Sequence, residues 1–204
     1  MGNREALIDG AKRCLREKGF TRPTARDIAT AAGVSLAAIG YHFGSKEALM
    51  KEALREAMAE WGEQLGDTMV GGPAPEAEPR ARFEQGWNQA IEAMPASRPL
   101  WLTQFEILSQ ADHLPDVLAS LGGLQADARA GLAEMFGPLE ADADEETVQL
   151  VGAFYQVMML GVAGMWLADP AQTPSGADLA RALRAIADRI GEDDPAQATT
   201  EGDS

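Results

Sequence analysis

Hydrophobic and polar positions recur with helical spacing along most of the chain. Near the N-terminus, Leu7, Ile8, Ala11 and Leu15 repeat every three or four residues and predict one amphipathic helix. Similar segments follow, and most are opened or closed by a capping residue, a glycine or a proline. No stretch has the two-residue alternation of a half-buried strand. The pattern therefore predicts an all-α protein of about nine helices.

Residues 24–52 are predicted to contain two short helices and the start of a third. Thr24 is a good N-cap with Asp27 as its capping-box partner, and Gly33 fits the left-handed residue that ends a helix. Ser35 is then expected to cap the second helix. Two short helices joined by a glycine turn are typical of the helix-turn-helix, whose second helix can enter the major groove of DNA.

The outward positions of this segment carry hydroxyls, basic groups and an aromatic ring, which suit contacts with phosphates. Its inward apolar residues are expected to be ordinary core. Lys46 falls in the first turn of a helix, where a phosphate between the ammonium and the helix N-terminus would be well placed. The candidate DNA-contacting surface is made by Thr24, Arg26, Ser35, Ala37, Tyr41, His42 and Lys46.

The same segment, with the helix before it, resembles the N-terminal domain of TetR-type (AcrR-like) bacterial transcriptional regulators. The resemblance rests on residues 28–29, 32–35 and 41–49, and it covers about residues 4–52. It implies an all-helical homodimer whose third helix reads a double-stranded DNA operator, and whose C-terminal domain binds a releasing small molecule. By position it implies phosphate contacts for Thr24, Ser35, Tyr41 and Lys46, and base-edge contacts for Leu36, Ala37 and Tyr41.

One position departs from the pattern of that family. The family commonly has an aromatic residue two positions before the His-Phe pair, where this chain has Gly40. Gly40 removes one expected DNA contact and places glycine inside a helix, which costs about 1 kcal/mol relative to alanine. We therefore expect readout through thymine methyl groups, Tyr41, Arg26 and DNA shape.

Charge divides the chain along the same boundary. Residues 1–52 are predicted to form the helix-turn-helix domain, 53–191 a ligand-binding and dimerisation domain, and 192–204 a disordered acidic tail. Residues 1–55 carry ten basic and six acidic side chains, a formal net charge of +4, whereas the remainder carries −19. A basic head on an acidic body is expected when one end meets phosphate, although the whole chain has a net charge of −15.

Two of the later helices are candidates for a dimer interface. Residues 145–168 are apolar nearly all round, and Gly161 and Gly164 would let another backbone approach closely. Residues 176–190 carry one apolar stripe. Packed against their symmetry mates, the two helices would form a four-helix interface. Packing within one subunit only is the alternative.

Aromatic and methionine side chains gather in the helices that would enclose a cavity, and they suit an adaptable apolar site. For each of them, a place in the core is the alternative. Gln104, Glu106, His113 and Gln156 are polar side chains that could take part in recognition, with surface exposure as the alternative. The candidate ligand-binding residues are Trp87, Ile91, Trp101, Phe105, Leu108, Tyr155, Met158, Met159 and Trp166.

Other kinds of chemistry find little support. No catalytic, cofactor-binding or metal-binding motif is present, and the chain has two histidines, His42 and His113. The lone Cys14 lies near the apolar stripe of the first helix, which favours a reducing cytoplasm. Residues 148–167 are long enough to suggest a membrane span, but their glutamines and acidic flanks favour burial in a dimer core.

The sequence therefore favours a ligand-responsive DNA-binding transcriptional regulator, most simply a repressor released by a small apolar molecule. One alternative is a helical small-molecule or lipid-binding protein, or an enzyme, with a non-functional head. A further alternative is a regulator whose C-terminal domain binds another protein.

Overall fold

The computed structural model describes residues 2–70, 78–122, 125–136 and 142–191. Within these ranges the chain forms ten α-helices and two short 3-10 helices, and no strand. The all-α prediction is confirmed. The structure has ten α-helices in place of the predicted count of about nine. The predicted acidic tail lies outside the described residues.

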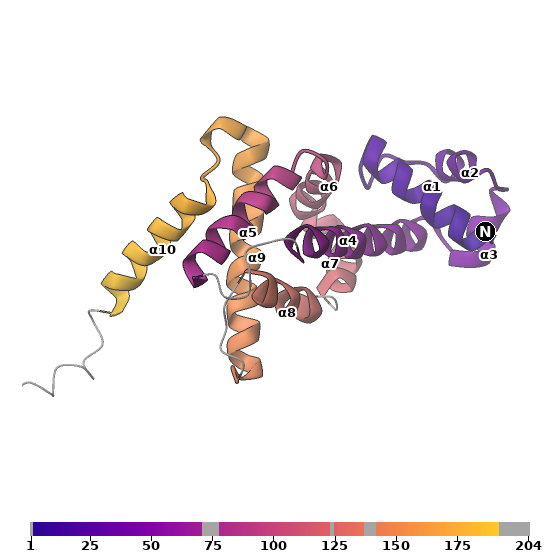
Figure 1. The fold of residues 1–204 in the computed structure, drawn as a ribbon. Coiled ribbons are helices and arrows are strands. Elements are labelled where there is room, and N and C mark those ends of the chain that lie inside the picture. Colours follow the sequence, from indigo (N-terminus) through magenta and orange to yellow (C-terminus); the bar gives the residue numbers. More distant parts are fainter. Residues whose placement is uncertain (1, 71–77, 123–124, 137–141, 192–204) are drawn as a thin grey trace, which may run out of the picture.

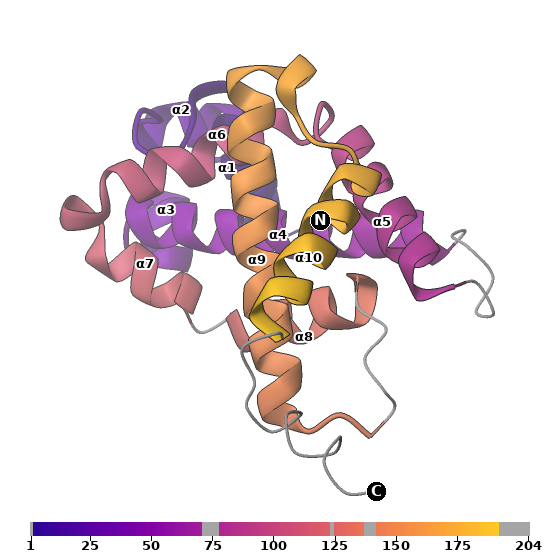
Figure 2. The same cartoon turned by 90° about the vertical axis from the view of Figure 1, so that its left-hand side faces the viewer.

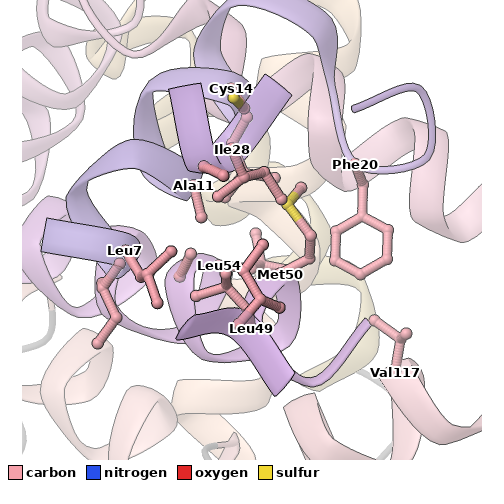
Figure 3. Close-up of a cluster of buried hydrophobic side chains, with 14 of the residues drawn as sticks. Leu7, Ala11, Cys14, Phe20, Ile28, Leu49, Met50, Leu54 and Val117 are labelled. Atoms are coloured by element: carbon pink, nitrogen blue, oxygen red, sulfur yellow. The ribbon is translucent and has the colours of Figure 1, made fainter. Parts of the chain in front are cut away.

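A small helical head occupies one end of the molecule (Figure 1). Its apolar stripes meet in one core, where Leu7, Ile28 and Leu49 are fully buried (Figure 3). Cys14 lies in this core as expected, and burial raises the pKa of its thiol. The head consists of α1 (Asn3–Lys18), α2 (Ala25–Ala32), α3 (Ala37–Phe43) and the first turns of α4 (Lys46–Val70).

The ends of the head helices follow the predicted caps, with one exception. The hydroxyl of Thr24 accepts a hydrogen bond from the Asp27 amide at 3.1 Å, and the Thr24 amide donates to Asp27 at 2.8 Å. Gly33 takes the left-handed conformation, with φ 68° and ψ 28°. The exception is α3, whose N-cap is Leu36 without a side-chain bond. Its first turn closes on backbone carbonyls, so the prediction that Ser35 caps it is wrong.

The body of the molecule continues from α4, which runs through the predicted domain boundary. Its core centres on Trp87, which stacks on Phe136 with ring centroids 4.7 Å apart. Asp144 caps α9, and Ser175 with Asp178 caps α10. The body adds α5 (Pro79–Ala93), α6 (Arg98–Ser109), η1 (Ala111–His113), α7 (Pro115–Gly122), α8 (Gln125–Phe136), α9 (Glu145–Ala168), η2 (Pro170–Gln172) and α10 (Gly176–Gly191).

The crossing of α8 and α9 depends on Gly152. A Cβ at this position would overlap the backbone carbonyl of Arg129, which cannot swing aside. We expect Gly152→Ala to lower the free energy of unfolding by about 1–3 kcal/mol, the usual cost of overpacking, in urea titrations. Gly131→Ala on α8 is the control, because that position is open and alanine should stabilise the helix by up to about 1 kcal/mol. Equal effects of the two substitutions would contradict the close crossing.

Candidate nucleic-acid interface and ligand cavity

The outer surface of the head presents the side chains predicted to contact DNA. Tyr41 of α3 is 85% exposed, and Leu36 beside the N-terminus of α3 is 49% exposed. On the inward side of the same helix, Ala38 and Ile39 are buried in the head core. Of the remaining candidates, Thr24, Arg26, Ser35 and Ala37 are exposed, whereas His42 and Lys46 are half-buried.

Several basic groups of the head are already neutralised within the protein. Lys18 pairs with Asp27 at 2.8 Å, and Lys12 pairs with Glu60 at 2.6 Å. Lys46 donates to the backbone carbonyl of Pro23 at 3.2 Å and lies 3.5 Å from Glu47. Arg26, by contrast, is exposed and forms no ion pair with any described residue. Arg26 is therefore a freer cation for phosphate than Lys46.

Lys46 nevertheless fixes the shape of this surface. Its bond to the carbonyl before Thr24 holds the N-terminus of α2 close to the N-terminus of α4. The hydroxyl and the amide of Thr24 both form hydrogen bonds with Asp27. In the free protein, Thr24 is therefore a helix cap rather than a free hydroxyl for phosphate. Gly40, where the related family commonly has an aromatic residue, is exposed and has open space around it. In the free protein, solvent therefore occupies the space that an aromatic side chain would fill.

The Asp27 carboxylate should make part of the fold sensitive to acid. The Lys18 ammonium, followed by the hydroxyl and amide of Thr24, holds the pKa of Asp27 well below its usual range. A carboxyl with a lower pKa in the folded state stabilises the fold above its unfolded pKa, and that contribution is lost as pH falls. The thermal unfolding temperature should therefore fall as pH drops below about 4, and Asp27→Asn should flatten this decline. Glu92→Gln, an exposed carboxylate on α5, is the control and should leave the decline unchanged.

The side of the body opposite the head is formed by α9 and α10 (Figure 2). An exposed apolar stripe follows α9 through Leu150, Phe154, Val157 and Met165, with Val157 70% exposed. By length and composition α9 could also cross a membrane, and 28% of its most apolar 18-residue segment is buried in the protein. The two glycines of this helix differ, because Gly161 faces open space whereas Gly164 lies against Phe105.

The apolar stripe predicted on α10 is divided along its length. Leu179 and Leu183 pack against the core of the body, whereas Ile186 and Ile190 are 54% and 71% exposed. The helix is tied to α5 at its start, where the Gly176 amide donates to Asn88 at 2.8 Å. Together the exposed apolar residues of α9 and α10 form a surface that no other part of the described chain covers.

A cavity of about 230 Å³ lies among α4, α6, α7, α8 and α9. Three predicted ligand residues line it, namely Trp101, Leu108 and Met159, and so do Gln104 and Gln156. The amide oxygen of Gln156 accepts a hydrogen bond from Arg129 at 3.3 Å. The remaining lining residues are apolar: Leu54, Met58, Trp61, Ile107, Leu118, Ala128, Leu132 and Leu160.

The other six predicted ligand residues do not line this cavity. They lie in or against the core of the body, where Trp87 and Tyr155 both pack on the ring of Phe136. Tyr155, for example, is 8% exposed and donates to the carbonyl of Phe136 at 3.5 Å. The residues placed in this core are Trp87, Ile91, Phe105, Tyr155, Met158 and Trp166.

The contribution of α4 to the cavity was missed in the sequence. Leu54, Met58 and Trp61 recur at helical spacing on one face of α4, and this repeat was the available signal. Trp61 packs edge-on against Trp101 with ring centroids 5.1 Å apart. The aromatic wall of the cavity therefore combines a helix shared with the head and a helix of the body.

Glu106 has a place that the sequence did not reveal. It lies on α6 but accepts hydrogen bonds from the amides of Phe20 and Thr21 in the head, at 2.9 and 3.1 Å, and from the Thr21 hydroxyl. Burial opposes ionisation of Glu106, yet these bonds hold its pKa below the usual value. His113 lies exposed in η1 and does not line the cavity.

Comparisons with known proteins match the head in sequence and nearly the whole chain in fold. The profile described as "Bacterial regulatory proteins, tetR family" matches residues 7–53. The HTH-type transcriptional repressor AcnR of Corynebacterium efficiens is 36% identical over 67 residues, which are 33% of this chain and 36% of that protein. The chain thus spans about a third of the length of this relative.

Two solved structures extend the likeness to the body. The transcriptional regulator SCO7518 of Streptomyces coelicolor A3(2) has a TM-score of 0.66 at 22% identity, covering 91% of this chain and 96% of its own. The multidrug binding protein EbrR, crystallised with imidazole, has a TM-score of 0.64 at 23% identity, covering 91% and 94%. At these identities the likeness concerns the fold.

Proposed function

Because residues 7–53 place the chain in the TetR family of bacterial regulatory proteins, we propose that it is a ligand-responsive DNA-binding transcriptional regulator, most simply a cytoplasmic repressor. The observation that carries the proposal is the exposed face of α3 and α2, where Tyr41 and Arg26 project from a helix-turn-helix head and Arg26 forms no ion pair with the described residues. A guanidinium and a phenol on a rigid helix pair suit phosphate and base-edge contacts. Gly40 leaves this helix with few side-chain donors, which favours readout by shape.

The cavity supports a small apolar effector. Its lining contains no charged side chain, and two tryptophans and two methionines give it an adaptable apolar wall. Its volume of about 230 Å³ exceeds the roughly 150 Å³ of an engineered cavity that binds benzene. Gln104 and Gln156 would supply hydrogen bonds to a polar group of the ligand. EbrR, which shares this fold, is named as a multidrug binding protein.

The outer face of α9 and α10 supports a homodimer. Contiguous exposed apolar residues on two neighbouring helices are typical of an interaction site, and a two-fold axis would let each stripe cover its copy. A dimer would also hold two heads about 34–36 Å apart, which lets them contact successive turns of DNA. The face lies opposite the head, so pairing there leaves both α3 helices free (Figures 1 and 2).

The alternatives have less support. The relatives named above are regulators or a binding protein, and none is named as an enzyme. No cluster of three potential metal ligands occurs among the described residues. A protein partner for the body would be favoured if neutral apolar probes failed to enter the cavity, which the tryptophan fluorescence of Trp61 and Trp101 would report.

The proposal is tested by fluorescence anisotropy with labelled DNA from the region upstream of the protein's own gene. Binding is measured at about 150 mM salt with excess competitor DNA, conditions that suppress non-specific contacts. Saturable binding with two subunits, or a multiple of two, per site is expected. Binding that the competitor abolishes would argue against an operator in this region, and no binding even at low salt would reject the proposed function.

A further inference from the structure

The head and the cavity meet along α6. Gln104, Ile107 and Leu108 of this helix line the cavity, and Glu106 among them holds the segment that follows α1. Helical geometry puts Glu106 on the side of α6 away from Gln104 and Leu108. One rigid helix therefore contacts the candidate ligand site with one side and the DNA-contacting head with the other.

The hydrogen bonds between Glu106 and the head use both carboxylate oxygens. Oε2 accepts from the Phe20 amide at 2.9 Å, while Oε1 accepts from the Thr21 amide at 3.1 Å and from the Thr21 hydroxyl. We call these three bonds the Glu106 clasp. Gly19, at φ 81°, leaves room for it, because a Cβ there would collide with Oε2. The head segment is thus shaped to admit a carboxylate from the body.

The surroundings of the clasp make it sensitive to the position of α6. Phe20 is buried in the head core, and Ile107, the neighbour of Glu106, is buried in the same core at 1% exposure. Val117 of α7 reaches this core too (Figure 3). Hydrogen bonds weaken steeply once the donor and acceptor separate beyond about 3.5 Å. A shift of α6 by about 1 Å along the line of the clasp would therefore break its bonds.

We propose that Glu106 is the positioning residue that couples the cavity to the head. An occupant that displaces α6 at Gln104 and Leu108 withdraws Glu106 from Phe20 and Thr21, and the head loses its fixed orientation on the body. Such an occupant must bind the open-clasp state more tightly than the closed one. The readout on DNA rests on the proposed function, whereas the opening of the clasp can be measured without DNA.

The first experiment measures the clasp directly with the cavity filled by a side chain. Leu160 lines the cavity from α9 and is not one of the three residues of the clasp, so Leu160→Trp stands in for a ligand, with Leu160→Phe as a smaller alternative. Amide hydrogen exchange at Phe20 and Thr21 should accelerate about tenfold or more in the filled protein, a coupling of ordinary size. The Ile28 amide, bonded to Thr24 within the head, is the internal control. Unchanged exchange at Phe20 and Thr21 in both variants would overturn the proposal.

The second experiment is a double-mutant cycle on operator affinity. In the wild-type background, Leu160→Trp should weaken operator binding about tenfold, whereas in Glu106→Asp, which keeps the charge but shortens the side chain, it should weaken it less than about twofold. In the background of Thr21→Val, which removes one of the three bonds, the weakening caused by Leu160→Trp should lie between these two values. A merely structural Glu106 would give additive effects, and additivity would overturn the proposal.

The control for stability is Gln149→Ala, which removes a hydrogen bond from α9 to the carbonyl of Ala126, away from the head. It should leave the effect of Leu160→Trp at full size. If the wild-type protein bound no DNA, the proposed function would fail, and the exchange experiment would still decide whether the cavity and the clasp are coupled.

Discussion

Val157→Glu is expected to convert the protein into a folded monomer and to abolish tight operator binding. Val157 is 70% exposed in the middle of the α9 stripe, so a carboxylate there costs the isolated subunit little. In the proposed dimer the same carboxylate would be buried near its own symmetry copy, and an unpaired buried charge costs about 3–5 kcal/mol. Sedimentation equilibrium measures the loss of the dimer. Circular dichroism establishes that the helices remain.

The loss of operator affinity should exceed the effect of any single DNA contact. Two linked heads bind one site with an avidity about 10²–10⁴ times that of one head, and the monomer forfeits this gain. Leu102→Glu, at 44% exposure on α6, is the matched control, because it adds the same charge to an apolar exposed position outside the stripe. A Val157→Glu protein that stays dimeric would place the interface elsewhere.

Replacement of both Arg26 and Tyr41 by alanine is expected to weaken operator binding by about 10²-fold or more, since base or phosphate contacts are worth about 1–3 kcal/mol each. Both side chains are exposed and support no part of the head core, so the fold should persist. For each of the two that contacts phosphate, the slope of log affinity against log salt should shrink by about 0.9. Anisotropy titrations between about 50 and 200 mM salt measure both quantities.

Arg80→Gln supplies the control for net charge, because Arg80 is an exposed arginine of α5 in the body. It should change neither the affinity nor the slope. Lys46→Ala provides a contrast within the head. Its ammonium already bonds the Pro23 carbonyl, so we expect a smaller change in salt slope than for Arg26→Ala. If the double variant bound the operator like the wild type, α3 and α2 would not be the DNA-contacting elements.

Much of the head could be predicted because its determinants are local. The Thr24–Asp27 capping box, the left-handed Gly33 and the apolar stripe of α1 each act within one or two helical turns. The failure at Ser35 has a local cause as well. The turn before α3 closes on backbone carbonyls, so the helix begins one residue later than a serine cap would place it.

The ligand residues were harder to predict, because an aromatic residue on a buried face can line a cavity or fill a core. Trp87 and Trp101 look alike in the sequence. The structure stacks Trp87 on Phe136 and leaves Trp101 beside the cavity. The choice depends on how α5, α6 and α8 cross, and crossing angles are not encoded in the period of one helix. The roles of these residues in ligand binding stay predictions.

The sequence by itself determined most of the helices, the helix-turn-helix head, its basic charge and the residues on its outer face, because capping, periodicity and charge are properties of neighbouring residues. Only the tertiary structure decided where the cavity lies, which cations of the head are already paired, and that Glu106 bonds to the chain at Phe20. Phe20 and Glu106 are 86 positions apart, and such a contact exists only once α1 and α6 have packed together.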